Sequence, residues 1–141
     1  MTRCIYAFLL FSVVSSSFFY CRKPADVICM VFEGTGESVC TEGDVTMKNG
    51  KPDGLLKFYY NTGEIAIEQE FSEGVPDGYG QAFYKNSVLR SKGYLDMNIR
   101  VGIHKDYYPS GKIKEYRYFE NDTAIYIKIY DDAGRIIKSL L

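Results

Sequence analysis

The chain has 141 residues, which is enough for one ordinary domain. Its formal net charge of −1 gives no overall field that would attract nucleic acid or an anionic membrane surface. With 13 tyrosines, 9 phenylalanines, 13 glycines, no tryptophan and only 4 prolines, the composition is typical of a β-rich chain.

The first predicted element is an N-terminal export segment. Residues 4–21, CIYAFLLFSVVSSSFFYC, carry no charge, and basic residues flank them on both sides. A short basic start, an apolar run and then small residues are typical of a secretory signal peptide, with cleavage after Ser16 or Ser17. The alternative is an uncleaved anchor, because an uncharged run of this length just spans a bilayer. Residues 1–17 are therefore predicted to be a signal peptide or anchor, and the protein to be periplasmic, secreted or membrane-anchored at the cell envelope.

Residues 18–42 are predicted to be an N-terminal joint that contains a hairpin. The segment VICMVFEGTGESVC has two β-prone arms around a Gly-Thr-Gly turn, and a two-residue turn at Gly34-Thr35 places Cys29 opposite Cys40. In an oxidising compartment this pair can form a disulfide, whereas two buried free thiols are the alternative. Cys21 is then free, lipidated or paired with another chain, although Tyr20 before it is not the small residue that lipidation signals carry.

The rest of the chain repeats itself at a step of 24 residues. KFYYNTGEI at 57–65 returns as QAFYKNSVL at 81–89 and as KDYYPSGKI at 105–113. A fixed period of this length indicates a repeat architecture, and a fourth, irregular copy over 130–136 is one residue longer. The columns that align are Gly54/Gly78/Gly102, Tyr59/Phe83/Tyr107, Tyr60/Tyr84/Tyr108, Gly63/Ser87/Gly111, Ile65/Leu89/Ile113 and Phe71/Leu95/Phe119.

Each unit is predicted to be a β-hairpin. The loops are too short for parallel crossovers, so the fold class is all-β, with an elongated single antiparallel meander sheet of hairpin repeats about 24 residues long. Gly63 and Gly111 are expected to have a positive φ that closes the hairpin turn. Ser87 replaces this glycine in the middle copy, which predicts a strained or altered turn there.

The pattern Tyr-Tyr-x-x-Gly-x-Ile, an aromatic residue eight positions after the glycine, and Asn/Glu-Gly-x-x-x-Gly resemble the MORN-variant repeat over residues 43–141. Bacterial proteins with this repeat often carry an antitoxin-like label. The resemblance implies a shared scaffold rather than a catalytic site. An antitoxin role also implies the cytoplasm, which conflicts with an exported N-terminus.

One face of the predicted sheet changes from acidic to basic along the chain. Residues 43–78 hold 3 Lys and 7 Asp or Glu, whereas residues 79–119 hold 8 Lys or Arg and 3 Asp or Glu. This face is either solvated surface that keeps edges from aggregating or a docking surface with tyrosine rings between charges. The aromatic columns themselves are expected to be core ladders. The candidate partner-binding residues are Glu64, Glu68, Glu70, Arg90, Lys92, Tyr94, Lys112, Lys114 and Tyr116.

The sequence offers no catalytic constellation. His104 is the only histidine, it has no cysteine or serine partner at a suggestive spacing, and it is expected to lie on the surface. Zinc and phosphate-loop motifs do not occur, so no cofactor, metal or nucleic acid is predicted. We therefore expect a non-enzymatic, exported repeat scaffold that binds a protein partner. The alternatives are a lipid-associated module and an immunity-like protein that binds a toxin.

Overall fold

The computed structural model describes residues 6–9, 16–19, 29–31, 38–41 and 46–140, and these residues form strands joined by turns. Ten strands make one sheet in the order β14-β13-β12-β11-β10-β9-β8-β7-β4-β3, and every neighbouring pair in it is antiparallel. The long strands are β7 (Gly54–Tyr59), β8 (Ile65–Ser72), β9 (Val75–Phe83), β10 (Leu89–Asp96), β11 (Ile99–Tyr107), β12 (Ile113–Glu120), β13 (Thr123–Tyr130) and β14 (Ile136–Leu140).

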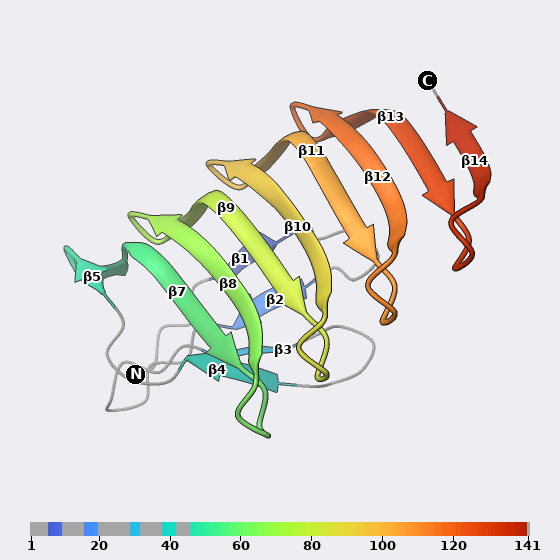
Figure 1. The fold of residues 1–141 in the computed structure, drawn as a ribbon. Coiled ribbons are helices and arrows are strands. Elements are labelled where there is room, and N and C mark those ends of the chain that lie inside the picture. The colour runs from blue at the N-terminus through green and yellow to red at the C-terminus, as the bar shows by residue number, and fades with distance from the viewer. Residues whose placement is uncertain (1–5, 10–15, 20–28, 32–37, 42–45, 141) are drawn as a thin grey trace.

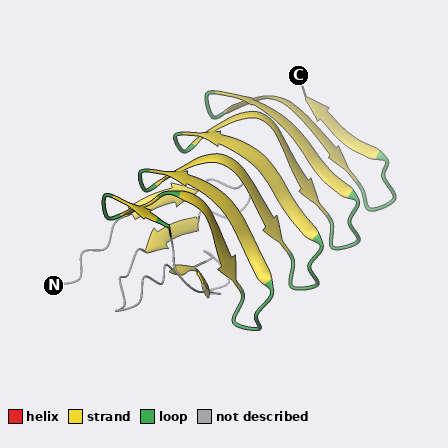
Figure 2. Cartoon of the chain, turned by 60° about the vertical axis from the view of Figure 1, so that its left-hand side comes forward, coloured by secondary structure: helices red, strands yellow, loops and turns green. Residues whose placement is uncertain are grey.

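From β7 to β14 the chain runs as a meander in which each strand pairs with the next (Figure 1). The strands lie side by side in a long, curved sheet whose two ends are far apart, as the turned view also shows (Figure 2). The predicted all-β, elongated antiparallel meander is therefore confirmed. Short loops force this outcome, because only antiparallel neighbours can be joined by two-residue turns.

The N-terminal region adds strands that belong to no repeat. β3 (Cys29–Val31) pairs with β4 (Ser38–Thr41), with Cys29 opposite Cys40 and a disulfide between them. β4 in turn pairs with β7, so the joint continues the repeat sheet. The proposed Gly34-Thr35 turn lies outside the described residues, as does Cys21.

The apolar N-terminal segment contains two short strands, β1 (Tyr6–Leu9) and β2 (Ser16–Phe19), which pair with each other. The described residues include no helix that is long and apolar enough to cross a membrane. This arrangement does not test export, so signal-peptide cleavage after Ser16 or Ser17 stays a prediction.

The two-residue turns at one end of the strands share the same backbone geometry. β5 (Met47–Lys48) and β6 (Lys51–Pro52) enclose Asn49-Gly50, and both residues of this pair have a positive φ. Glu73-Gly74, Met97-Asn98 and Asn121-Asp122 repeat that geometry, as expected for two-residue turns of the I′ type. The three later turns each donate a backbone N–H to the preceding unit: Gly74 to the Pro52 carbonyl, Asn98 to that of Pro76 and Asp122 to that of Arg100.

The turns at the opposite end of the strands explain the repeat column Gly63/Ser87/Gly111. In the middle copy the Tyr84 N–H donates to the Val88 carbonyl and the Ser87 N–H to the Tyr84 carbonyl, and the same two bonds close the turns at Gly63 and Gly111. Both glycines have a positive φ, which confirms that prediction. Ser87 has a φ of 60°, so the middle turn keeps its form and places a side chain in the left-handed region that glycine favours.

The second aromatic column is a ladder that ties each unit to the next. The Tyr60 hydroxyl donates to the Phe83 carbonyl at 2.7 Å, and Tyr84 and Tyr108 repeat this bond one unit further on, to the carbonyls of Tyr107 and Tyr130. Tyr60 itself is buried in the core. The prediction that this column is structural is confirmed, and the bonds explain why the motif needs tyrosine rather than phenylalanine there.

The fourth copy corrects one prediction. The Asp131 N–H donates to the Arg135 carbonyl, which places Asp131 in the column of Tyr108 and gives its turn the same length as the others. The copy is therefore not one residue longer; it starts one residue early. The reason lies in the bulges: β9 and β11 each accommodate two extra residues against the preceding strand, whereas β13 accommodates only one, between Ala124 and Tyr126.

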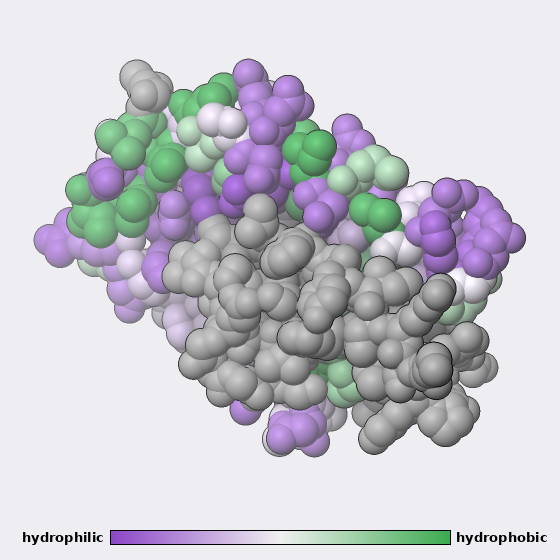
Figure 3. All heavy atoms as spheres, turned by 180° about the vertical axis from the view of Figure 1, so that it is seen from behind, coloured by the Kyte–Doolittle hydropathy of each residue, from purple (hydrophilic) through white to green (hydrophobic). Residues whose placement is uncertain are grey.

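The core lies on one side of the sheet and is concentrated at its β4-to-β10 end. It contains Val39, Leu56, Phe58, Tyr60, Ala66, Ile67, Phe71, Ala82 and Leu95. At the other end β14 is exposed along its whole length, and Ile136, Ile137 and Leu140 leave apolar surface open to solvent. Figure 3 shows apolar residues gathered at this C-terminal end of the molecule.

Candidate functional site

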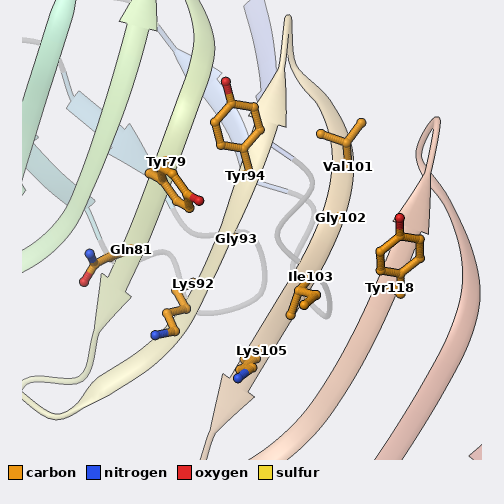
Figure 4. Close-up of a pocket in the computed structure, with 10 residues that line it drawn as sticks. All are labelled: Tyr79, Gln81, Lys92, Gly93, Tyr94, Val101, Gly102, Ile103, Lys105 and Tyr118. Atoms are coloured by element: carbon orange, nitrogen blue, oxygen red, sulfur yellow. The ribbon is translucent and has the colours of Figure 1, made fainter.

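An open depression of about 610 Å³ lies across β9, β10, β11 and β12, on the face of the sheet opposite the core. Its lining comes from four strands, and the labelled side chains project from one side of the sheet (Figure 4). We call the outward side chains of these strands the tyrosine–lysine face. They are Tyr79, Gln81, Lys92, Tyr94, Val101, Ile103, Lys105, Tyr116 and Tyr118.

Strand register arranges this face into two rows that run across the strands. Directly opposed residues in an antiparallel pair share a face, so successive pairings extend a row from strand to strand. The polar row is Lys57, Glu68, Gln81, Lys92, Lys105, Tyr116, Lys128 and Ser139. The apolar row beside it is Tyr79, Tyr94, Val101 with Ile103, Tyr118 and Tyr126.

The apolar row is held rigid by ring contacts and yet faces solvent. Tyr79 and Tyr94 meet edge to face, with ring centroids 5.0 Å apart and an interplanar angle of 84°. Tyr79 is nevertheless 67% exposed and Ile103 is 49% exposed. Such rings present a large contact area and lose little conformational entropy on binding, which suits them to an interface.

Two lysines of the polar row, Lys92 and Lys105, lack acidic partners among the described residues. Lys92 lies directly opposite Lys105, and neither forms an ion pair in the part of the chain that the structure describes. The Lys105 ammonium lies 5.7 Å from the centroid of the Tyr116 ring, a cation–π contact that leaves the charge unneutralised. Two like charges directly opposite each other destabilise a sheet by a few tenths of a kcal/mol or more.

The acidic end of the predicted surface is already engaged within the chain. Glu68 forms an ion pair with Lys57 at 3.0 Å, and Glu70 accepts a hydrogen bond from the Tyr79 backbone N–H at 2.7 Å. Glu64 precedes β8 and accepts a hydrogen bond from the Thr62 hydroxyl, which lowers the pKa of its carboxyl. These three glutamates therefore support local structure.

Three basic residues of the predicted set, Arg90, Lys112 and Lys114, do not line the depression. Arg90 and Lys114 occupy the position at which β10 and β12 shift register, so the strict alternation that placed them beside Lys92 and Tyr116 is wrong. The equivalent residue of the first unit, Ala66, is fully buried in the core.

Lys114 and Lys112 contact groups outside the depression. The Lys114 ammonium lies 5.9 Å from the ring of Tyr108, one of the ladder tyrosines. Lys112 lies in the turn before β12 and donates to the Asp132 carbonyl at 2.6 Å. Of the predicted set, Lys92 and Tyr94 line the depression, and Tyr116 borders it opposite Lys105.

Sequence reasoning missed Tyr79, Ile103 and Lys105, which come from β9 and β11. The prediction considered only the second strand of each unit. The alternation of β9 carried the signal, because Tyr79 is exposed between two buried glycines. The sequence pattern groups these residues within each strand, whereas the pairing of Lys105 with Lys92 depends on the register shift between Lys92 and Tyr94.

The opposite face of β10 to β12 holds a buried polar cluster, and it corrects the placement of His104. This side chain is only 5% exposed, its Nε2–H donates to the Tyr94 carbonyl at 2.9 Å, and its ring packs against Phe119. Burial lowers the pKa of His104, against the smaller opposing effect of the hydrogen bond. The surface position was wrong because Gly93 leaves room for an imidazole on the buried side of β10.

The arginines of this cluster are neutralised by carboxylates. Arg117 is buried beside Asp106 and Glu115, and the Arg100 guanidinium bonds Asp122 and holds the pKa of that carboxyl below its usual range. No group of three or more His, Cys, Asp or Glu residues in the described ranges is placed to hold a metal ion. Lys92 and Lys105, which form no ion pair among the described residues, lie instead on the tyrosine–lysine face.

Comparison with known proteins identifies the repeat. Residues 52–73 and 100–121 match the family model described as MORN repeat variant, and the two matches start 48 residues apart, which is two periods. No curated protein matches the chain. The matched segments, the shared period and the repeated hydrogen bonds show that this chain is a repeat scaffold that contains the MORN repeat variant.

Proposed function

We propose that this chain is an exported, non-enzymatic scaffold that binds a protein partner across the tyrosine–lysine face. The observation that carries the proposal is the depression over β9 to β12, where exposed tyrosines and isoleucine lie beside two lysines without acidic partners. Tyrosine is enriched in the central contacts of protein interfaces, and an apolar patch rimmed by charge is typical of them.

A purely solvated face explains the same residues less well. On a solvated sheet, charges of both signs are expected to alternate and to neutralise each other across strands. Glu68 and Lys57 do this at the acidic end, whereas Lys92 faces Lys105. An acidic partner would relieve that repulsion and would bury the exposed rings, at about 25 cal/mol for each Å² of apolar surface removed from water.

Export is supported by two features of the N-terminal region. The uncharged segment 4–21 with its basic flanks has the pattern of a signal peptide. The Cys29–Cys40 disulfide is a bond that persists in oxidising compartments. N-terminal sequencing of the protein purified from its host provides the test: a chain that begins at residue 17 or 18 is expected, and an intact Met1 in the soluble cytoplasmic fraction would contradict export.

Binding is tested by cross-linking the full-length tagged chain in its native host and identifying the recovered proteins and lipids together. The variant Lys92→Glu/Lys105→Glu reverses two charges on the face. The matched control Lys48→Glu/Lys138→Glu makes the same change in net charge at exposed residues of β5 and β14.

We expect wild type and control to recover one partner in stoichiometric amount and the face variant to lose it, with all three chains unfolding at the same urea midpoint. Recovery of that partner by the face variant would exclude this face as the site. Recovery of lipid without protein would instead favour a lipid-associated module.

A further inference from the structure

We propose that the partner presents an acidic amphipathic α-helix, which lies across β9 to β12 with its apolar side on the apolar row and its acidic flank on the polar row. This inference rests on the proposed function of the tyrosine–lysine face and specifies the partner element. It follows from the spacing of the two rows, from the charge of one of them and from the shape of the site.

The two rows run perpendicular to the strands, so their repeat distance is the separation between strands. Neighbouring strands lie about 4.8 Å apart, and β9 to β13 therefore extend roughly 19 Å. Along this line the apolar row presents Tyr79, Tyr94, Ile103, Tyr118 and Tyr126. The ligand that fits must offer side chains on one side at about 5 Å intervals, or at about 10 Å for alternate strands.

A helix has this spacing. Residues separated by three or four positions lie about 4.5–6 Å apart along the axis, and residues separated by seven lie about 10.5 Å apart. Three to four turns, or about 13 residues, cover the distance from β9 to β13. An apolar stripe at i, i+3, i+4 and i+7 would therefore contact the tyrosines of successive strands in turn.

An extended peptide does not have this spacing. Its side chains on one face recur at about 6.6–6.8 Å, which drifts out of phase with the rows after two strands. Extended ligands also bind by adding to a sheet edge, where backbone groups are unpaired. The tyrosine–lysine face lies on β9 to β12, each of which already pairs with a neighbour on both sides.

The charge of the polar row selects an acidic flank. Lys92 and Lys105 lie on adjacent strands, so carboxylates at i and i+3 or i+4 of a helix would each meet one lysine. Lys128 continues the row two strands beyond Lys105 and can meet a third carboxylate one to two turns later. On β8 the row carries Glu68, which is paired with Lys57, and Glu70 nearby accepts a bond from the Tyr79 N–H. Because these negative charges would repel an acidic ligand, its site ends at β8.

The shape of the site favours a helix over a bilayer. The lining residues enclose a depression, and a helix is a rod about 10 Å in diameter that can lie in it. A membrane surface contacts protruding side chains and cannot follow a hollow of this size. The same exposed rings and lysines would otherwise suit an anionic membrane, so the experiment includes that outcome.

The test uses a displayed library of randomised 16-residue peptides, selected on the full chain alone and then assayed on the Lys92→Glu/Lys105→Glu variant. We expect enriched peptides to carry Asp or Glu at i, i+3 or i+4 next to an apolar stripe of helical period. For a synthesised peptide, the face variant and a central proline should each weaken binding at least tenfold. The control Lys48→Glu/Lys138→Glu should bind as wild type does. Exchanging the peptide's acids for lysine should restore binding to the face variant.

Other outcomes separate this inference from the proposed function. Peptides that lose binding to the face variant but lack helical periodicity and tolerate proline would overturn the helix and leave the face as the binding site. Peptides that bind wild type and face variant equally would overturn both. If no peptide is enriched and phosphatidylglycerol vesicles bind wild type but not the face variant, the ligand is a lipid surface. Absence of both peptide and vesicle binding would count against the face itself.

Discussion

The close contact between Gly93 and His104 leads to a specific stability prediction. A Cβ added to Gly93 would lie 2.6 Å from Cγ of His104 and closer still to Nδ1 and Cε1. The ring has little freedom to withdraw, because its Nε2–H is bonded to the Tyr94 carbonyl and it packs edge to face with Phe119, with 4.9 Å between the ring centroids. The substitution Gly93→Ala must therefore move either the imidazole or the strands β10 and β11.

The expected cost has two parts. Adding a methyl group to a closely packed interior costs about 1–3 kcal/mol through displaced neighbours. If the imidazole leaves the Tyr94 carbonyl, a buried donor and acceptor lose their bond, at about 1–3 kcal/mol. With both parts, the free energy of unfolding should fall by roughly 2–6 kcal/mol. For a chain of this size each kcal/mol lowers the melting temperature by about 2–4 °C.

Urea unfolding followed by circular dichroism measures this loss, and a double-mutant cycle assigns it. Removing the imidazole with His104→Ala leaves space for the new methyl group. The double variant should thus be more stable, by about 1–3 kcal/mol, than the sum of the two single losses requires. A wild-type midpoint for Gly93→Ala, or strict additivity in the cycle, would refute this account of why glycine occupies position 93.

Two further predictions concern single residues in the repeats. Replacing Ser87, whose φ is 60°, by glycine should raise the free energy of unfolding by up to about 1 kcal/mol, because the left-handed conformation costs an L-residue about 1–2 kcal/mol and the flexible unfolded glycine offsets part of the gain. A lower urea midpoint for Ser87→Gly would contradict this. Burial lowers the pKa of His104 in the folded chain. Below about pH 6.5 the unfolded chain therefore binds more protons than the folded one, and the free energy of unfolding decreases as the pH is lowered. His104 is the only histidine, so His104→Gln should remove the decrease between pH 7 and pH 5, and an unchanged pH profile would disprove its role.

Much of the architecture could be predicted because the repeat restates the same local physics in each unit. Gly63 and Gly111 indicated turns that require a positive φ, and the tyrosine columns indicated an aromatic ladder. Loops too short for a crossover left only an antiparallel meander. These are interactions between residues close in sequence or one period apart, so inspection of a single sequence detects them.

The candidate site could be predicted only in part. The alternation of β10 correctly grouped Lys92 with Tyr94, but it could not show that the strand shifts register at Arg90. A bulge reverses which side a residue faces without changing the residue's own chemistry, so the pattern gave no warning. Arg90 and Lys114 were assigned to the wrong surroundings for this reason.

The sequence by itself determined the period, the strand order and the turn chemistry, since these depend on local backbone preference and on repetition. Only the tertiary structure decided which strands contribute to the tyrosine–lysine face, that His104 is buried over Gly93, and that the last unit starts one residue early. Each of these depends on the register between neighbouring strands. Register is set by bulges and by packing between residues far apart in sequence, where a shift of one residue exchanges the two faces of a sheet.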